Sequence, residues 1–228
     1  MKTNHLISIL IAEDHNVIRQ GLSSLLKSEE SFRVSGEAKN GREAVAMALA
    51  DHPDVILMDI SMPLLSGIEA TRQILAANPD ARIVILSAHT EDEYFEEMIK
   101  MGAFAFLNKD TSAHVLFGAI RKAADRAISF SPSIIKRLHH ENNRSQGRDR
   151  LVKFEFPNLT PREREVLQLV AEGLSNKQSA SELHISIKTI DKHRQSVMDK
   201  LDIHGTAGLT RYAISAGMIN VGARLTVA

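Results

Sequence analysis

Two kinds of apolar pattern alternate along the first 128 residues of the chain. Short, nearly continuous apolar runs, which are typical of buried strands, occur at Ile7–Ile11, Phe32–Gly36, Asp54–Met58, Arg82–Leu86 and Ala103–Leu107. Between and after them lie stretches with the apolar spacing of an amphipathic helix, at residues 15–28, 41–51, 66–77, 91–101 and 111–128. Because parallel strands need crossover connections, five strand–helix repeats predict a five-stranded parallel sheet with helices on both faces.

The composition changes after residue 128. Pro132–Leu138 is consistent with a short extra helix. The twelve residues His139–Arg150 contain no Ile, Leu, Val, Met, Phe, Trp or Tyr. Such a segment cannot bury enough apolar surface to offset the entropy lost on ordering, so we interpret it as a flexible linker.

From residue 158 onward the pattern is helical. Thr160-Pro161-Arg162-Glu163 is a capping box with proline at the first helical position, and it predicts a helix that ends near Gly173. Ser186 can cap a later helix, and two others are expected over residues 176–183 and 206–216. Four short helices joined by tight turns predict a helix-turn-helix unit. We therefore predict three regions: a domain over residues 1–128, a short helix and linker over 129–157, and a helical domain over 158–228.

Charge is distributed unevenly between these regions, although the 228-residue chain carries 28 basic and 28 acidic side chains. Residues 1–130 hold 13 basic and 18 acidic groups, residues 131–157 hold six and three, and residues 158–228 hold nine and seven. Overall neutrality by itself argues against a nucleic-acid partner. The regional balance instead indicates an acidic first domain and a mildly basic second one.

The remaining composition excludes several classes of protein. The chain has no cysteine, which excludes a disulfide framework, a thiolate zinc site and a cysteine nucleophile. Its ten histidines show no zinc-ligand spacing. The apolar run Leu6–Ala12 is too short for a signal peptide, and no run reaches the roughly 18 apolar residues of a membrane helix. We expect a soluble, cytoplasmic protein without a membrane partner.

Chemistry-bearing side chains follow four of the five predicted strands. The first strand ends in Glu13-Asp14 and the third in Asp59, while Ser87 and Lys109 follow the fourth and fifth. In an open α/β sheet, ligand sites form where the carboxyl ends of the strands meet. Each residue alone has an ordinary explanation as a turn starter or a solvated charge. Together they predict three carboxylates suited to Mg²⁺, facing a hydroxyl and an ammonium suited to phosphoryl oxygens.

Residues 5–128 resemble the receiver domain of bacterial two-component response regulators. The matching segments are Ile11–Asp14, Asp54–Pro63, Gly67, Ile85–Ala88 and Gly102–Lys109. The resemblance implies a flavodoxin-like five-stranded fold in which a sensor histidine kinase phosphorylates Asp59. It also implies that Glu13, Asp14, Asp59 and the backbone carbonyl of Ser61 hold Mg²⁺, and that Ser87 and Lys109 bind phosphoryl oxygens. Phe106 would be the aromatic residue whose rotamer reports the state of the domain.

Two positions depart from the common receiver pattern. Asp110 follows Lys109, where many receivers have proline, and Phe106 stands in place of the common tyrosine. A phenylalanine can fill the same pocket, but it has no hydroxyl group to donate a hydrogen bond.

The segment Ser186–Arg194 carries the polar residues of a DNA-reading helix. Recognition helices place their N-terminal residues against base edges in the major groove. Lys188 and Lys192 can donate to guanine or phosphate, and Thr189 can offer its methyl group to thymine. Asp191 cannot bond to phosphate, so it either accepts from cytosine or faces away. A helical bundle that makes protein contacts is the alternative reading of this domain.

Residues 159–190 contain motifs that resemble the LuxR-type helix-turn-helix. These are Leu159–Leu167, Gly173–Lys177 and Ser186–Ile190. With the receiver, they make the chain similar to transcriptional regulators of the NarL/FixJ type, with an all-α four-helix second domain. The resemblance implies the following DNA contacts: phosphates to Asn176 and Lys177, bases to Lys188, Thr189 and Lys192, and the groove wall to His193 and Arg194. The helix over 206–216 would supply a dimer contact.

This second domain departs from its family at two adjacent positions. Gln178 and Ser179 stand where the family usually has an acidic residue followed by a large apolar one. Ser179 would place a hydroxyl group in the small core, at a cost of roughly 1–3 kcal/mol.

We therefore expect a DNA-binding transcriptional response regulator switched by phosphorylation of Asp59. The unphosphorylated receiver would either mask the recognition helix or fail to dimerise, and phosphorylation would promote a homodimer on double-stranded DNA. The chain would not be an enzyme beyond slow self-dephosphorylation. The alternatives are a Mg²⁺-dependent phosphatase or phosphotransferase with Asp59 as nucleophile, and a regulator that acts without phosphorylation.

Overall fold

The computed structural model describes residues 6–88, 101–127, 159–216 and 218–219 of the chain. The helix expected over 91–101, apart from its last residue, lies outside this part, as do the short helix at Pro132–Leu138 and the linker His139–Arg150. No helix among the described residues is long and apolar enough to cross a bilayer.

Five parallel strands form one sheet in the order β2-β1-β3-β4-β5. The strands are β1 (Ile7–Ala12), β2 (Phe32–Ala38), β3 (Val55–Asp59), β4 (Ile83–Ser87) and β5 (Ala105–Asn108). This is the flavodoxin-like order, so the predicted fold class is confirmed. The last strand begins two residues later than expected, although the backbone N–H of Phe104 already donates to the carbonyl oxygen of Ile83 at 2.8 Å.

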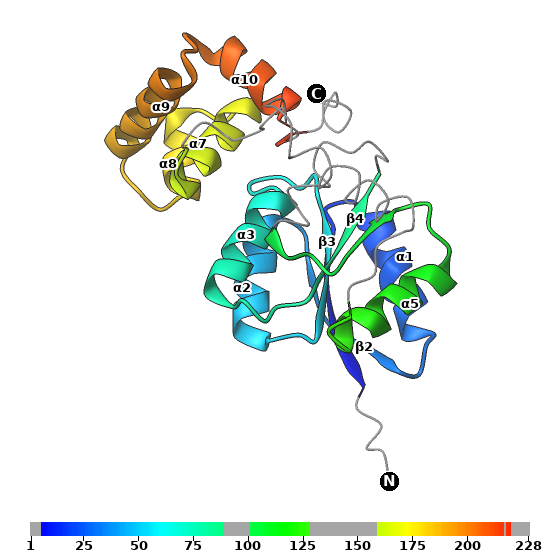
Figure 1. Ribbon diagram of the computed structural model, residues 1–228. Coiled ribbons are helices and arrows are strands. Elements are labelled where there is room, and N and C mark those ends of the chain that lie inside the picture. Colours follow the sequence, from blue (N-terminus) through cyan, green and yellow to red (C-terminus); the bar gives the residue numbers. More distant parts are fainter. Residues whose placement is uncertain (1–5, 89–100, 128–158, 217, 220–228) are drawn as a thin grey trace, which may run out of the picture.

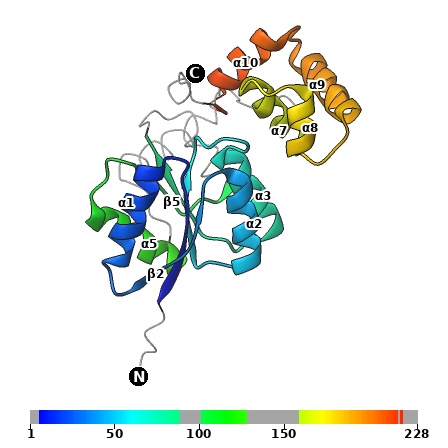
Figure 2. The same cartoon turned by 180° about the vertical axis from the view of Figure 1, so that it is seen from behind.

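Helices cover both faces of the sheet, as Figures 1 and 2 show. One pair is α1 (Asn16–Lys27) and α5 (Ala113–Ala124), and the other is α2 (Gly41–Asp51) and α3 (Gly67–Ala77). Successive strand residues point to opposite faces. Leu10, Ile56 and Met58 therefore join the core under α2 and α3, while their neighbours Ile9, Ile11 and Leu57 join the core under α1 and α5.

The loop after β3 folds tightly back onto the end of its own strand. The N–H of Gly67, at the start of α3, donates to the carbonyl oxygen of Ile60 at 2.8 Å. A Cβ atom at Gly67 would lie 1.8 Å from the carbonyl oxygen of Asp59, so only glycine fits there. The six-residue segment between Ile60 and Gly67 therefore has little room to move independently of Asp59.

The second domain contains four helices. These are α7 (Pro161–Ala171), α8 (Asn176–Glu182), α9 (Ile187–Leu201) and α10 (Thr206–Ser215). The side chain of Thr160 accepts from the N–H of Glu163, whose carboxylate accepts from the N–H of Thr160 in return. The side chain of Ser186 caps α9 by accepting from the N–H of Thr189. The predicted helix-turn-helix arrangement is therefore confirmed.

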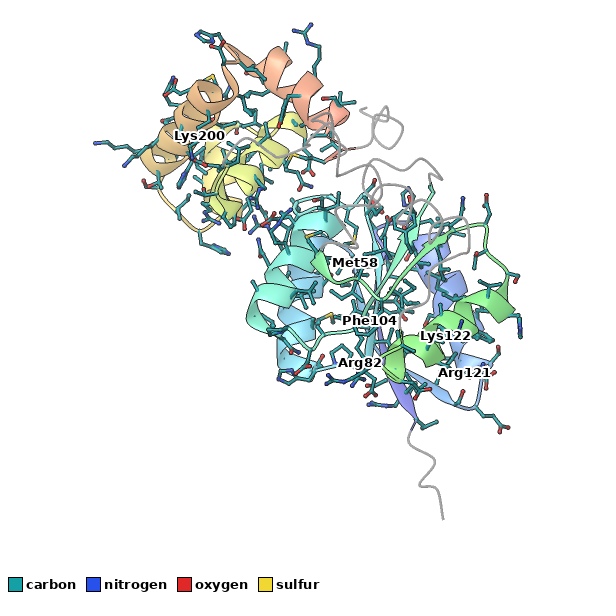
Figure 3. The ribbon with its side chains drawn as sticks, viewed as in Figure 1. Met58, Arg82, Phe104, Arg121, Lys122 and Lys200 are labelled. Atoms are coloured by element: carbon teal, nitrogen blue, oxygen red, sulfur yellow. The ribbon has the colours of Figure 1, made fainter. Side chains whose placement is uncertain are left out.

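Glu163 also ties α7 to α9. Its carboxylate accepts from Ser196 Oγ at 2.7 Å and from Lys200 Nζ at 2.7 and 2.9 Å (Lys200 is labelled in Figure 3). Burial raises the pKa of Glu163, but the hydrogen bonds from Lys200, Ser196 and Thr160 outweigh it and hold the pKa at about 2. The capping carboxylate is therefore ionised at neutral pH and fixes the position of α9.

Ser179 lies in the core of this domain, as the sequence indicated. Its side chain is 0% exposed, and its hydroxyl group has no hydrogen-bond partner among the described residues. A buried hydroxyl without a partner loses its hydration and gains nothing in return.

We predict that Ser179→Ala stabilises the helical domain. Removing the unpartnered hydroxyl should raise the free energy of unfolding by about 1 kcal/mol. Chemical denaturation followed by circular dichroism measures this change. Ser181→Ala, at an exposed position of the same helix, is the matched control and should change little. A destabilised Ser179→Ala variant would show that the hydroxyl group has a partner in solution.

Candidate functional site

The carboxyl ends of the strands bring three acids and a lysine together. Glu13 and Asp14 follow β1, Asp59 is the last residue of β3, and Lys109 follows β5. One carboxylate oxygen from each of the three acids and a ring nitrogen of His15 all lie within 4.8 Å of one another. The joint placement that the sequence predicted for these residues is therefore present in the structure.

Lys109 bridges two of the acids. Its Nζ atom lies 2.7 Å from Glu13 Oε2 and 3.0 Å from Asp59 Oδ1. Burial lowers the pKa of Lys109, but the charges of Asp59 and Glu13 outweigh it, so the net pKa is raised. The ammonium group is therefore charged at neutral pH and offsets part of the negative charge.

Asp59 is the most strongly perturbed acid of the group. It is 3% exposed. Burial, with repulsion from Glu13, raises its pKa to about 6, although Lys109 opposes the shift. Its Oδ2 atom is buried and has no hydrogen-bond partner among the described residues. An unpartnered carboxylate oxygen beside two further acids fits a hard divalent cation with oxygen ligands.

His15 belongs to the same cluster, although the sequence did not indicate it as a site residue. Its Nδ1 atom lies 2.8 Å from Asp14 Oδ1 and 3.0 Å from Glu13 Oε1, and its side chain is 51% exposed. The only sequence signal was its position directly after the two acids, which does not separate a site residue from a solvated one.

Ser87 and Phe106 have the positions that the sequence predicted on neighbouring strands. Ser87 is buried at the end of β4, and its carbonyl oxygen accepts from the backbone N–H of Lys109 at 2.8 Å. Phe106 is half-buried and packs against the core under α2 and α3. Ser61 lies in the loop after β3, two residues beyond Asp59. The roles assigned to these three residues remain predictions.

A second group of functional interest joins this loop to the helical domain. Gln168 of α7 is 1% exposed, although it is polar. Its Oε1 atom accepts from the backbone N–H of Ser66 at 2.7 Å, and its Nε2 atom donates to the carbonyl oxygen of Met62 at 2.9 Å. Glu172 accepts from the backbone N–H of Leu64 at 3.0 Å and from Gln168 Nε2 at 2.8 Å. We call Gln168 and Glu172 the α7 clamp.

Charged side chains surround the clamp. Arg164 of α7 lies 3.0 Å from Glu69 of α3, whose carboxylate is buried. Glu165 accepts from Gln73 Nε2 at 3.0 Å and from an Arg42 nitrogen at 3.4 Å. The interface was not predicted from the sequence. Its one signal was Gln168 itself, a polar residue within the apolar run Val166–Val170.

Helix α9 lies on the side of the helical domain that is turned away from the receiver (Figures 1 and 2). Lys188 and Lys192 on α9, and Lys177 on α8, are exposed, while Thr189 and His193 are half-buried. This is the arrangement expected for residues that approach DNA.

Two of the predicted DNA contacts bond to protein groups instead. Asn176 Oδ1 accepts from an Arg194 nitrogen at 3.1 Å. Asn176 Nδ2 donates to Asp191, and a second Arg194 nitrogen donates to Thr206. Asn176 and Arg194 therefore connect α8, α9 and α10, and the phosphate contact assigned to Asn176 stays a prediction.

Comparison with known families agrees with both halves of the fold. The family described as "Response regulator receiver domain" matches residues 9–121, and "Bacterial regulatory proteins, luxR family" matches residues 157–213. The chain is 32% identical to the "Transcriptional regulatory protein DegU" of Brevibacillus brevis, over 94% of this chain and 96% of that one. It is 34% identical to the "Response regulator protein VraR" of Staphylococcus aureus, over 93% and 99%.

Solved structures give the same result. A LuxR-family two-component response regulator from Aurantimonas sp. SI85-9A1 has a TM-score of 0.55 and 28% identity, over 60% of this chain and 97% of that one. The RcsB response regulator of Salmonella typhimurium has a TM-score of 0.53 and 25% identity, over 93% and 100%.

Fold and site together define a receiver joined to a DNA-binding helix-turn-helix domain. The chain belongs to the two-component response regulators that carry a LuxR-type DNA-binding domain. It is a DNA-binding regulator of transcription, as the sequence predicted.

We predict that Mg²⁺ binds more tightly as pH rises from about 5 to about 7.5, because the ion must displace the proton from Asp59. With the pKa of Asp59 at about 6, affinity should fall by about tenfold for each pH unit below that value. Calorimetric titration measures this dependence. Asp59→Asn removes this competing proton, so the variant should bind more weakly and with a flatter pH profile. An affinity of the native chain that does not change with pH would contradict the prediction.

We also predict that Gln168→Ala separates the two domains. The variant loses both hydrogen bonds to the loop and leaves the Met62 carbonyl and the Ser66 N–H unpartnered, which should weaken docking by about 2–3 kcal/mol. Small-angle X-ray scattering should then report a larger radius of gyration. Gln20→Ala, at an exposed position of α1, should scatter like the native chain. Identical scattering from Gln168→Ala would show that the clamp does not hold the domains together.

Proposed function

We propose that Asp59 accepts a phosphoryl group from a sensor histidine kinase, and that this modification switches DNA binding. The proposal rests on Asp59 Oδ2, which lies beside Lys109 and two other acids, is buried, and has no hydrogen-bond partner in the part of the chain that the structure describes. A carboxylate oxygen is a competent nucleophile for phosphorus. The new O–P bond forms as the bond between phosphorus and the kinase histidine nitrogen breaks.

The side chains around Asp59 suit this transfer. A pKa of about 6 leaves most of the Asp59 carboxylate ionised at neutral pH, so the nucleophile is ready. Lys109 lies 3.0 Å from Asp59 Oδ1, so its ammonium group can pass to a phosphoryl oxygen without leaving the site. Ser87, whose backbone carbonyl oxygen accepts from the N–H of Lys109, would bind a second phosphoryl oxygen.

Glu13, Asp14, Asp59 and the carbonyl oxygen of Ser61 are the groups that would hold Mg²⁺. When bound, the ion supplies positive charge that offsets the charge of the transferring phosphoryl group. The phosphorylated side chain adds up to about two negative charges to a site that is already acidic. Lys109 alone does not balance them, so the proposal requires the metal.

We propose that the change reaches the helical domain through the loop after β3. This loop begins at Asp59, contains Ser61, and gives its backbone groups at Met62, Leu64 and Ser66 to the α7 clamp. Because Gly67 lies so close to the Asp59 carbonyl, the loop cannot move far without moving the end of β3. A shift of the loop therefore disturbs the clamp and weakens docking.

The size of the effect is consistent with a partial switch. Three hydrogen bonds between the clamp and the loop contribute about 1 kcal/mol each. A change from 1:99 to 99:1 requires about 5.5 kcal/mol, so losing these bonds gives about half of a complete switch. Interdomain ion pairs and dimerisation on DNA would supply the remainder.

The position of α9 favours control of dimerisation over masking. The recognition helix faces away from the described part of the receiver (Figure 1), whereas docking holds α7 and the end of α8. Arg42 donates to the backbone carbonyl of Glu182 at 3.4 Å, so α8 is held as well. In the proposal, release frees the helical domain to pair with a second copy on DNA. The protein acts in the cytoplasm and has no enzymatic activity beyond slow self-dephosphorylation.

Asp59→Asn should abolish labelling by radioactive acetyl phosphate, because an amide nitrogen replaces the attacking oxygen and cannot form the acyl phosphate. It should also remove the increase in DNA affinity that acetyl phosphate causes in the native chain. Asp51→Asn, at an exposed position at the end of α2, is the matched control and should behave like the native chain.

Three outcomes would overturn the proposal. Undiminished labelling of Asp59→Asn would show that another residue accepts the phosphoryl group. Equal DNA occupancy by the native chain and Asp59→Asn, after treatment with acetyl phosphate, would favour a regulator that acts without phosphorylation. Repeated turnover of phosphate esters would favour the phosphatase alternative.

A further inference from the structure

Asp191 is an acidic residue on a helix that must approach a polyanion. It lies in the second turn of α9, is exposed, and is followed directly by Lys192. A carboxylate near DNA phosphates is repelled by them and cannot donate a hydrogen bond. Asp191 therefore weakens general affinity for DNA unless it meets a hydrogen-bond donor, and in the major groove such donors are on the bases.

A chain of hydrogen bonds holds Asp191 in place. Asn176 Nδ2 donates to Asp191 Oδ1, Asn176 Oδ1 accepts from Arg194 at 3.1 Å, and Arg194 donates to Thr206. Carboxylates only accept and guanidinium groups only donate, so the orientation of the Asn176 amide is fixed by its two neighbours. The three helices α8, α9 and α10 thus fix the position of the Asp191 carboxylate.

We infer that Asp191 is a specificity-determining residue that selects cytosine in the major groove. A carboxylate has about four acceptor positions, and the Asn176 amide takes one of them. Cytosine presents the N4 amino group as a donor, whereas guanine and thymine present acceptors that repel a carboxylate. Adenine presents a donor beside the N7 acceptor, which makes it a poorer partner.

Lys188 and Lys192 supply the complementary part of the interaction. Both are exposed, three residues before and one residue after Asp191 on α9. Their charges attract phosphates or guanine acceptors and offset the repulsion that Asp191 adds. Base selection by Asp191 does not depend on phosphorylation of Asp59.

Selection of binding sites from a random DNA library tests the inference directly. The full native chain, at low salt where binding is strongest, should select sites with cytosine at one position of each half-site. Asp191→Ala should lower the preference for that cytosine by about tenfold and should bind unrelated DNA more tightly. Asp191→Asn should shift the preference from cytosine to adenine, because an amide can pair with both N6 and N7.

Asp199→Ala is the matched control. Asp199 is exposed on the same helix, two turns further from its N-terminus, and accepts from Gln195 Nε2 at 2.8 Å. This variant should select the same sites as the native chain. If Asp191→Ala and Asp191→Asn also select those sites unchanged, Asp191 faces away from the bases and the inference is wrong. The same conclusion follows if the native chain selects no cytosine.

Discussion

The loop after β3 is the constraint on which the two halves of the molecule depend. Its first residue adjoins Asp59, and its last is held where Gly67 lies so close to the Asp59 carbonyl that no side chain fits. The same loop gives backbone groups to Gln168 and Glu172 of the helical domain. Because the segment is short and anchored at both ends, the acidic site and the docking of α7 are not independent of each other.

The balance of charge in the acidic site is a second constraint on the molecule. Three acids share one rim, and Lys109 contacts two of them. Because Asp59 is buried, water cannot stabilise its charged form, and its pKa therefore rises to about 6 instead of staying near its usual value. An acidic site that is short of positive charge has affinity for a cation and responds strongly to a phosphoryl group. The overall neutrality of the chain conceals this local imbalance.

Much of the fold, and the meeting of the acids with Lys109 at one rim, could be predicted from the sequence. Strands buried on both faces require continuous apolar runs, and parallel strands end at a shared rim, so the placement of Asp59 with Lys109 followed from periodicity alone. The partners of Gln168 did not, because they lie about a hundred residues away and depend on how two separate domains meet. Patterns among neighbouring residues in the sequence do not specify how two domains pack against each other. Asn176 shows a related limit, since a residue type suited to phosphate also suits Asp191 and Arg194.

In the proposed switch, phosphorylation of Asp59 releases α7 from the loop, and the distance between the two domains tests this directly. The chain has no cysteine, so single cysteines at the exposed positions Lys27 of α1 and Asp199 of α9 can carry a pair of spin labels. Pulsed electron resonance then measures the distance between the domains before and after treatment with acetyl phosphate and Mg²⁺. We expect a narrow distance distribution that shifts to longer distances and broadens on phosphorylation, and that stays narrow when Asp59 is replaced by Asn. An unchanged distribution in the fully phosphorylated chain would contradict it.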